Sequence, residues 1–134
     1  MSAWGVSNFE NDTALDWVGK IVKQKDINLI TNSIDKFVNG FNAEETTLIN
    51  CSKFLTIAEI LAGLLGSPAE DFPEELTDWI ESKYINVEQS TIDTAIEGVR
   101  LLMNESEVRE MYLDSGYFNS WDKAQKNLIK RLSK

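Results

Sequence analysis

The sequence predicts an all-α fold, a single compact bundle of six or seven helices around a central, largely buried helix. Apolar residues recur at helical spacing along most of the 134 residues, and no segment alternates as a strand would. Polar N-cap residues and glycines divide the chain into short elements. With 43% hydrophobic residues and two prolines, the composition suits one globular domain, 1–134.

The segment 1–11 is predicted to be a non-helical, aromatic lead-in to the first helix. It contains Trp4 and Phe9, and we expect it to fold back against one end of the core. Asn11 and the two residues after it are good N-cap residues. From there an amphipathic stripe that includes Trp17 predicts a helix ending near residue 24 or 25.

A second helix is predicted after Asp26, and it ends at Asn39-Gly40. The central helix follows at about 43–65. Its second half is apolar nearly all round, which is typical of a helix buried on most sides. After a loop that contains both prolines, helix-start signals predict further helices from about Pro73, Ser90, Ser106 and Asn119.

The opening pattern WGxxxFENDxAxDW resembles that of a bacterial family catalogued as a domain of unknown function, which opens with WGxxxF(D/E)NDxAxD. Stretches 58–62 and 106–112 are also similar to that family. The resemblance implies a fold and brings no established activity. The matching residues are Trp4, Gly5, Phe9, Glu10, Asn11, Asp12, Ala14 and Asp16.

Composition excludes several classes of function. The net charge of −9, from 22 acidic and 13 basic residues, argues against nucleic acid as a direct ligand and suits a basic protein partner. Histidine is absent, so histidine triads and the usual zinc sites are excluded. Cys51 is the only cysteine, so no disulfide can form within the chain. We therefore expect no metal and no cofactor.

The chain has no signal-peptide pattern at its start. Its most apolar run, 54–65, is interrupted by Glu59 and is too short to span a membrane. We expect a cytoplasmic bacterial protein with no membrane partner.

Glu59 is the most informative single residue, because it lies inside the most apolar helix. A buried carboxylate must be paired, hydrogen-bonded or protonated. We considered Arg100, Arg109 and the backbone or indole donors of the Trp-Gly lead-in as its partners. An anchor that ties the lead-in to the central helix is the favoured interpretation, and an active-site or ligand-binding acid is the alternative.

Two further groups of residues have a functional and a structural interpretation. Glu10, Asp12 and Asp16 would suit Mg²⁺ or Ca²⁺, but charge and capping at a helix start explain them without a metal. Six aromatic residues would suit a ligand pocket, but aromatic residues at helical spacing are usually core. They are Trp4, Phe9, Trp17, Trp79, Tyr112 and Trp121. The candidate ligand or anchor residues are Trp4, Gly5, Glu10, Asn11, Asp12, Asp16, Trp17 and Glu59; none is assigned as catalytic or as a metal ligand.

The function expected from these features is that of a non-enzymatic binding protein, immunity-type or regulatory, which uses an acidic helical surface. This expectation rests on the class of protein and not on a recognised site. The alternative is a carboxylate-based enzyme or small-ligand sensor with a site near Glu59 and the Trp-Gly motif. The partner and the oligomeric state stay open.

Overall fold

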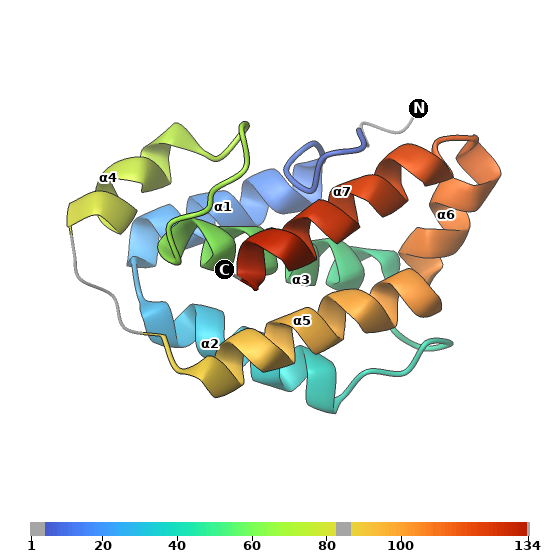
Figure 1. The fold of residues 1–134 in the computed structure, drawn as a ribbon, viewed down its shortest axis with the longest axis horizontal. Helices are drawn as coiled ribbons and strands as arrows, with labels where there is room; N and C mark the ends of the chain where they lie inside the picture. The colour runs from blue at the N-terminus through green and yellow to red at the C-terminus, as the bar shows by residue number, and fades with distance from the viewer. Residues whose placement is uncertain (1–4, 83–86, 134) are drawn as a thin grey trace.

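Helix α3 (Leu48–Leu64) runs through the middle of a helical bundle (Figure 1). The computed structural model describes residues 5–82 and 87–133, and these residues form seven helices and no strand. The predicted all-α bundle is therefore confirmed. The other helices are α1 (Asp12–Gln24), α2 (Ile27–Asn39), α4 (Glu74–Ser82), α5 (Gln89–Asn104), α6 (Glu107–Ser115) and α7 (Phe118–Leu132).

The remaining helices surround α3. Helices α1, α2, α5, α6 and α7 all contact it, whereas α4 and α6 lie at opposite ends of the bundle (Figure 1). From Cys51 to Gly63 every residue of α3 except Lys53 is buried. A helix buried on all sides has no single apolar face, which is why the sequence shows an unbroken apolar run there.

The central helix begins at Leu48, five residues later than the predicted 43. The Asn42 side chain accepts hydrogen bonds from the backbone N–H groups of Glu44 and Glu45, at 2.9 and 3.3 Å. This closes a local turn, and Thr47 then caps the helix by accepting from Asn50 N at 3.2 Å. Asn42 is a good cap residue directly before the predicted start of the helix, but in the structure it caps a turn.

The helix boundaries elsewhere follow from local capping chemistry. Asn11, Asp26 and Ser106 each accept a hydrogen bond from a first-turn backbone N–H. Gly116 ends α6 with φ of 84°, a conformation that favours glycine. These are local signals, and the sequence predicted them. No helix of the described residues is long and apolar enough to cross a membrane.

Gly98 allows α5 to approach the centre of the bundle closely. A Cβ atom placed there would lie 2.3 Å from the ring of Phe54 on α3 and 2.9 Å from Val38 on α2. Gly19 on α1 is the opposite case, because a Cβ atom there would meet nothing within 4 Å. The two glycines are therefore a matched pair for testing the packing of the core.

We predict that Gly98→Ala lowers the free energy of unfolding by about 1–3 kcal/mol, because the added methyl group overpacks the core. Gly19→Ala should instead raise it by up to about 1 kcal/mol, since alanine is the better helix former in an open position. Urea unfolding of both variants measures the two effects. Equal stability changes for the two variants would contradict this packing.

Candidate functional site

The loop 5–11 packs against several separate parts of the bundle (Figure 1). The Phe9 ring is buried and meets the Phe72 ring edge-on, with centroids 6.0 Å apart. The Tyr112 hydroxyl of α6 donates a hydrogen bond to the carbonyl of Gly5. The Ser7 hydroxyl donates to Asp71 in the loop between α3 and α4. The described part of the lead-in is thus packed against the core.

An ion pair between Glu59 and Arg131 lies beneath this loop. The two guanidinium NH groups donate to the two carboxylate oxygens at 2.9 and 3.2 Å, so the pair is bidentate. The Glu59 side chain is 5% exposed and that of Arg131 is 12% exposed. A buried carboxylate of α3 is therefore joined to the last turn of α7.

Asn8 connects the loop to this ion pair. Its amide nitrogen donates to Glu59 Oε2 and to Gln125 Oε1, both at 2.9 Å. Gln125 Nε2 donates back to Asn8 Oδ1 at 2.9 Å. Asn8 is 6% exposed and Gln125 is fully buried, so unpaired amides at these positions would be costly. We call Asn8, Glu59, Gln125 and Arg131 the anchor cluster.

A second set of polar contacts continues along the same side of α3. Ser52, Thr56 and Glu59 follow one another at helical spacing, and all three are buried. The Ser52 hydroxyl donates to Asn11 Oδ1 at 2.8 Å, and Asn11 also caps α1 through Ala14 N. The Thr56 hydroxyl lies 3.4 Å from the carbonyl oxygen of Asn8. The buried stripe of α3 thus holds the middle of the loop at Asn8 and its C-terminal end at Asn11.

The guanidinium of Arg131 has further acceptors. Its Nε donates to Asn127 Oδ1 at 2.7 Å, and NH1 also lies 3.3 Å from the carbonyl oxygen of Ser67. A cleft of about 390 Å³ lies beside the pair, and Ser7, Lys123 and Glu70 are among its lining residues. Since Asn8 and Arg131 occupy both oxygens of Glu59, a proton transfer from Glu59 would require breaking the ion pair. The geometry favours the anchor interpretation.

The structure separates the other residues that the sequence singled out. Trp4 lies outside the described residues. Glu10 Oε1 accepts from Ser7 N at 3.1 Å, while Asp12 and Asp16 are exposed. Gly5 has no positive φ; instead, a Cβ atom there would lie 2.5 Å from the Glu10 side chain. In residues 5–82 and 87–133, no group of three or more His, Cys, Asp or Glu side chains could hold a metal ion.

Trp17 lines a different groove from the one beside Glu59, between α1, α2 and α3. Trp79 and Trp121 are buried in the core, and Trp121 stacks on Tyr112 with ring centroids 5.5 Å apart. The aromatic residues that the structure describes therefore do not form one common pocket around Glu59.

Two buried groups have a pKa well above the ordinary value for their type. Burial raises the pKa of the Cys51 thiol to about 11, against a weaker opposing hydrogen bond with the backbone of Val108. Burial, with a smaller effect of Glu10, raises the pKa of Tyr112 to about 12. A buried neutral thiol is a poor nucleophile, so Cys51 acts as a core residue.

The sequence did not identify Arg131 as the partner of Glu59. Arg100 is exposed, and Arg109 NH1 instead lies 3.5 Å from Glu110. From the sequence alone, Arg131 is explained as a charge that the helix dipole favours in the last turn of its helix. One usable signal was present: Gln125 interrupts the apolar stripe of that helix, and a polar residue on a core face needs a partner.

We predict that Arg131→Met lowers the free energy of unfolding by about 3–5 kcal/mol, because it leaves the Glu59 carboxylate buried without its counter-charge. Glu59→Met should also be strongly destabilising. The double variant should recover part of the loss, since it buries no unpaired charge. Urea unfolding of the three variants gives the coupling free energy of the pair.

Lys126→Met is the matched control for this double-mutant cycle. It removes a cation from the same helix, where Lys126 Nζ lies 2.8 Å from Asp122 in an exposed pair. Such a pair contributes at most about 1 kcal/mol. If Arg131→Met costs no more than this control, the anchor cluster does not stabilise the fold.

Comparison with known proteins places this chain in one family. Residues 2–124 match the family model described as "Domain of unknown function (DUF4259)". Asn8 and Glu59 lie inside the matched span, while Gln125 and Arg131 follow it. No curated protein and no solved structure matches the chain. Because the family model covers most of the sequence, the chain belongs to the family Domain of unknown function (DUF4259).

Proposed function

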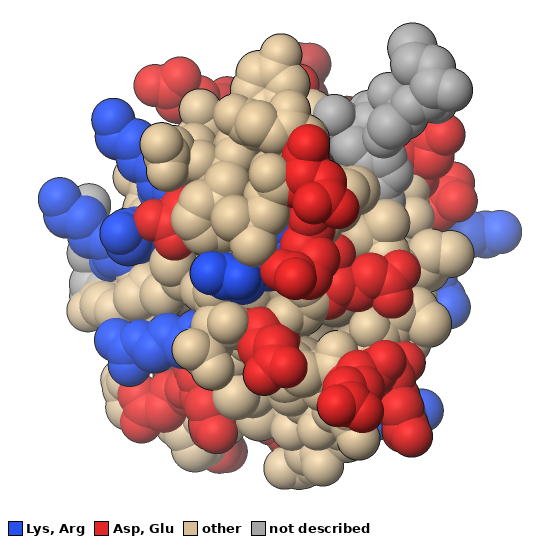
Figure 2. All heavy atoms as spheres, turned by 90° about the vertical axis from the view of Figure 1, so that its right-hand side faces the viewer, with Lys and Arg blue, Asp and Glu red and all other residues tan. Residues whose placement is uncertain are grey.

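We propose that this protein is a non-enzymatic binding protein of the bacterial cytoplasm, immunity-type or regulatory, which holds a basic protein partner on an acidic helical surface. The observation that carries the proposal is the distribution of carboxylates at one end of the bundle. Figure 2 shows acidic side chains spread across that end. Most of the basic side chains in Figure 2 lie near the margins of the view, so the middle of this face has a predominantly negative potential.

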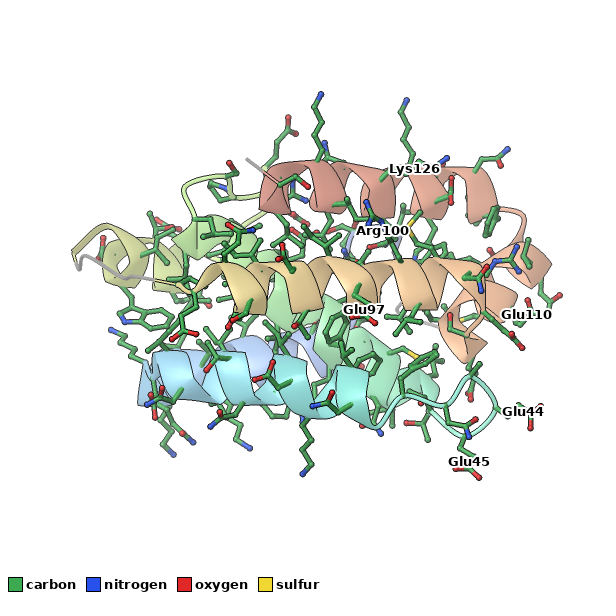
Figure 3. The ribbon with its side chains drawn as sticks, turned by 60° about the horizontal axis from the view of Figure 1, so that its bottom comes forward. Glu44, Glu45, Glu97, Arg100, Glu110 and Lys126 are labelled. Atoms are coloured by element: carbon green, nitrogen blue, oxygen red, sulfur yellow. The ribbon has the colours of Figure 1, made fainter. Side chains whose placement is uncertain are left out.

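The acidic end face is built by α6, by the corner before it and by the loop between α2 and α3. Glu110 of α6 and Glu44 and Glu45 of the loop extend from this end of the bundle, away from the core (Figure 3). Arg109 is the one basic residue of these segments, and it is paired with Glu110. The exposed acidic residues of the face are Glu44, Glu45, Glu105, Glu107, Glu110 and Asp114.

Surface carboxylates of this kind favour binding of a basic partner in two ways. They accelerate encounter with a cationic protein, and they exclude acidic competitors through like-charge repulsion. The anchor cluster supports the proposal indirectly, because it employs Glu59 in holding the fold together. The carboxylate-enzyme alternative would need that same group to be free for proton transfer.

We predict that neutralising Glu44, Glu45 and Glu110 to Gln weakens binding of the captured basic partner at least about tenfold at low salt, because each charge contributes to steering and complementarity. Raising the salt should release the partner from the unmodified protein as well, since exposed charges are screened within ~10 Å at 0.1 M ionic strength. Affinity capture identifies the partner, and titration with the purified partner measures the binding.

The matched control neutralises Glu75 and Glu88 to Gln and Asp78 to Asn, three exposed acids on α4 and just before α5, away from α6. This control changes the net charge by the same amount as the first set. If the partner binds at the acidic end face, the control should leave binding almost unchanged. Equal weakening in both sets would reduce the effect to total charge. Salt-independent binding that neither set weakens would overturn the proposal.

A further inference from the structure

A groove between α1, α2 and α3 lies away from the anchor cluster. Its volume is about 640 Å³, which falls in the range of small-molecule sites. Each helix contributes an aromatic residue to its wall: Trp17 from α1, Phe37 from α2 and Phe54 from α3. The rings of Phe37 and Phe54 stack with centroids 4.3 Å apart.

Each of these helices also contributes a lysine: Lys20 from α1, Lys36 from α2 and Lys53 from α3. In a chain with only 13 basic residues and a net charge of −9, three cations that meet at one groove are unexpected. None of the three has an ion pair with a carboxylate of the described residues. The groove therefore concentrates positive charge on an acidic protein.

The charge of Lys53 is in an unfavourable environment in this groove. The ammonium groups of Lys20 and Lys53 lie 4.5 and 4.2 Å from the centre of the Trp17 ring. The ring attracts both cations, but more weakly than the negative charge of an anion would. Burial, followed by the charges of Lys20 and Lys36, lowers the pKa of Lys53. An anion bound between these groups would relieve their mutual repulsion.

We propose that this groove binds a small organic anion, with its carboxylate or phosphate group against Lys20, Lys36 and Lys53 and its apolar or aromatic body against Trp17 and Phe37. The aromatic wall favours such a body over a bare inorganic ion. Asn32, Ser33 and Asn50 also line the groove and supply polar groups that fix the orientation of a ligand. This site goes beyond the proposed protein-binding function and does not depend on it.

The test is an NMR titration of the ¹⁵N-labelled protein with two aromatic anions, phenyl phosphate and benzoate. We expect saturable shifts of the Trp17 indole N–H and of the Asn50 and Lys53 amides, with half-saturation at about 1 mM or below. Tighter binding of phenyl phosphate would assign a phosphate ligand, and tighter binding of benzoate a carboxylate. Inorganic phosphate should bind more weakly than phenyl phosphate, and neutral benzyl alcohol should not saturate these signals.

Charge variants identify the groove as the place of binding. Lys53→Gln should weaken binding of the aromatic anion at least about fivefold, since one of the three facing cations is lost. Lys23→Gln is the matched control, because Lys23 is an exposed lysine of α1 that does not line the groove. It should leave the affinity unchanged within about twofold.

Three results would overturn the proposal. The first is the absence of saturable shifts with either aromatic anion up to about 10 mM. The second is equal weakening by the groove variant and by Lys23→Gln, which would indicate a general charge effect. The third is saturation of the same signals by a hexaglutamate peptide when neither aromatic anion binds, which would assign the groove to an acidic protein segment.

Discussion

The bidentate ion pair between Glu59 and Arg131 is the interaction on which the rest of the structure depends. Burying a carboxylate in the most apolar helix is costly unless its charge and its hydrogen bonds are satisfied. Arg131 supplies the counter-charge from near the end of the chain, and Asn8 supplies a donor from near its beginning. Satisfying the Glu59 carboxylate therefore requires that both the N-terminal loop and the last helix contact the central helix. Removing either partner of such a pair is costly, because the other charge then stays buried without its counter-charge.

Local features of this fold could be predicted from the sequence, and contacts between distant segments could not. The caps of α1, α2 and α6 depend on side chains next to the helices they begin, so Asn11, Asp26 and Ser106 were informative. The buried position of Glu59 followed from its apolar neighbours. Its partner did not, because 72 residues separate Glu59 from Arg131, and spacing in the sequence does not show which helices meet. The predicted start of the central helix after Asn42 was wrong, since a good cap residue starts a turn as readily as a helix.

The molecule carries two charged surfaces of opposite sign. Carboxylates cover the end formed by α6 and the loop between α2 and α3, whereas lysines from three helices meet in the groove beside Trp17. The net charge of −9 indicated the first surface but concealed the second, because Lys20, Lys36 and Lys53 are far apart in the sequence. Only the packing of α1 and α2 on α3 brings the three together. The anchor cluster thus stabilises the scaffold that carries both surfaces, and none of its residues belongs to either surface.

The most direct test that α3 holds the N-terminal loop in place is native-state hydrogen exchange of first-turn amides, which ordinarily exchange by local fraying. The Ala14 N–H is bonded to Asn11, whose side chain is held by Ser52 of α3. The Asn28 and Asn50 N–H groups are bonded to the exposed caps Asp26 and Thr47. If the loop is locked to α3, Ala14 exchanges only with global unfolding, as the core amides of α3 do, while Asn28 and Asn50 exchange much faster. Exchange of Ala14 as fast as that of the other two would contradict the account.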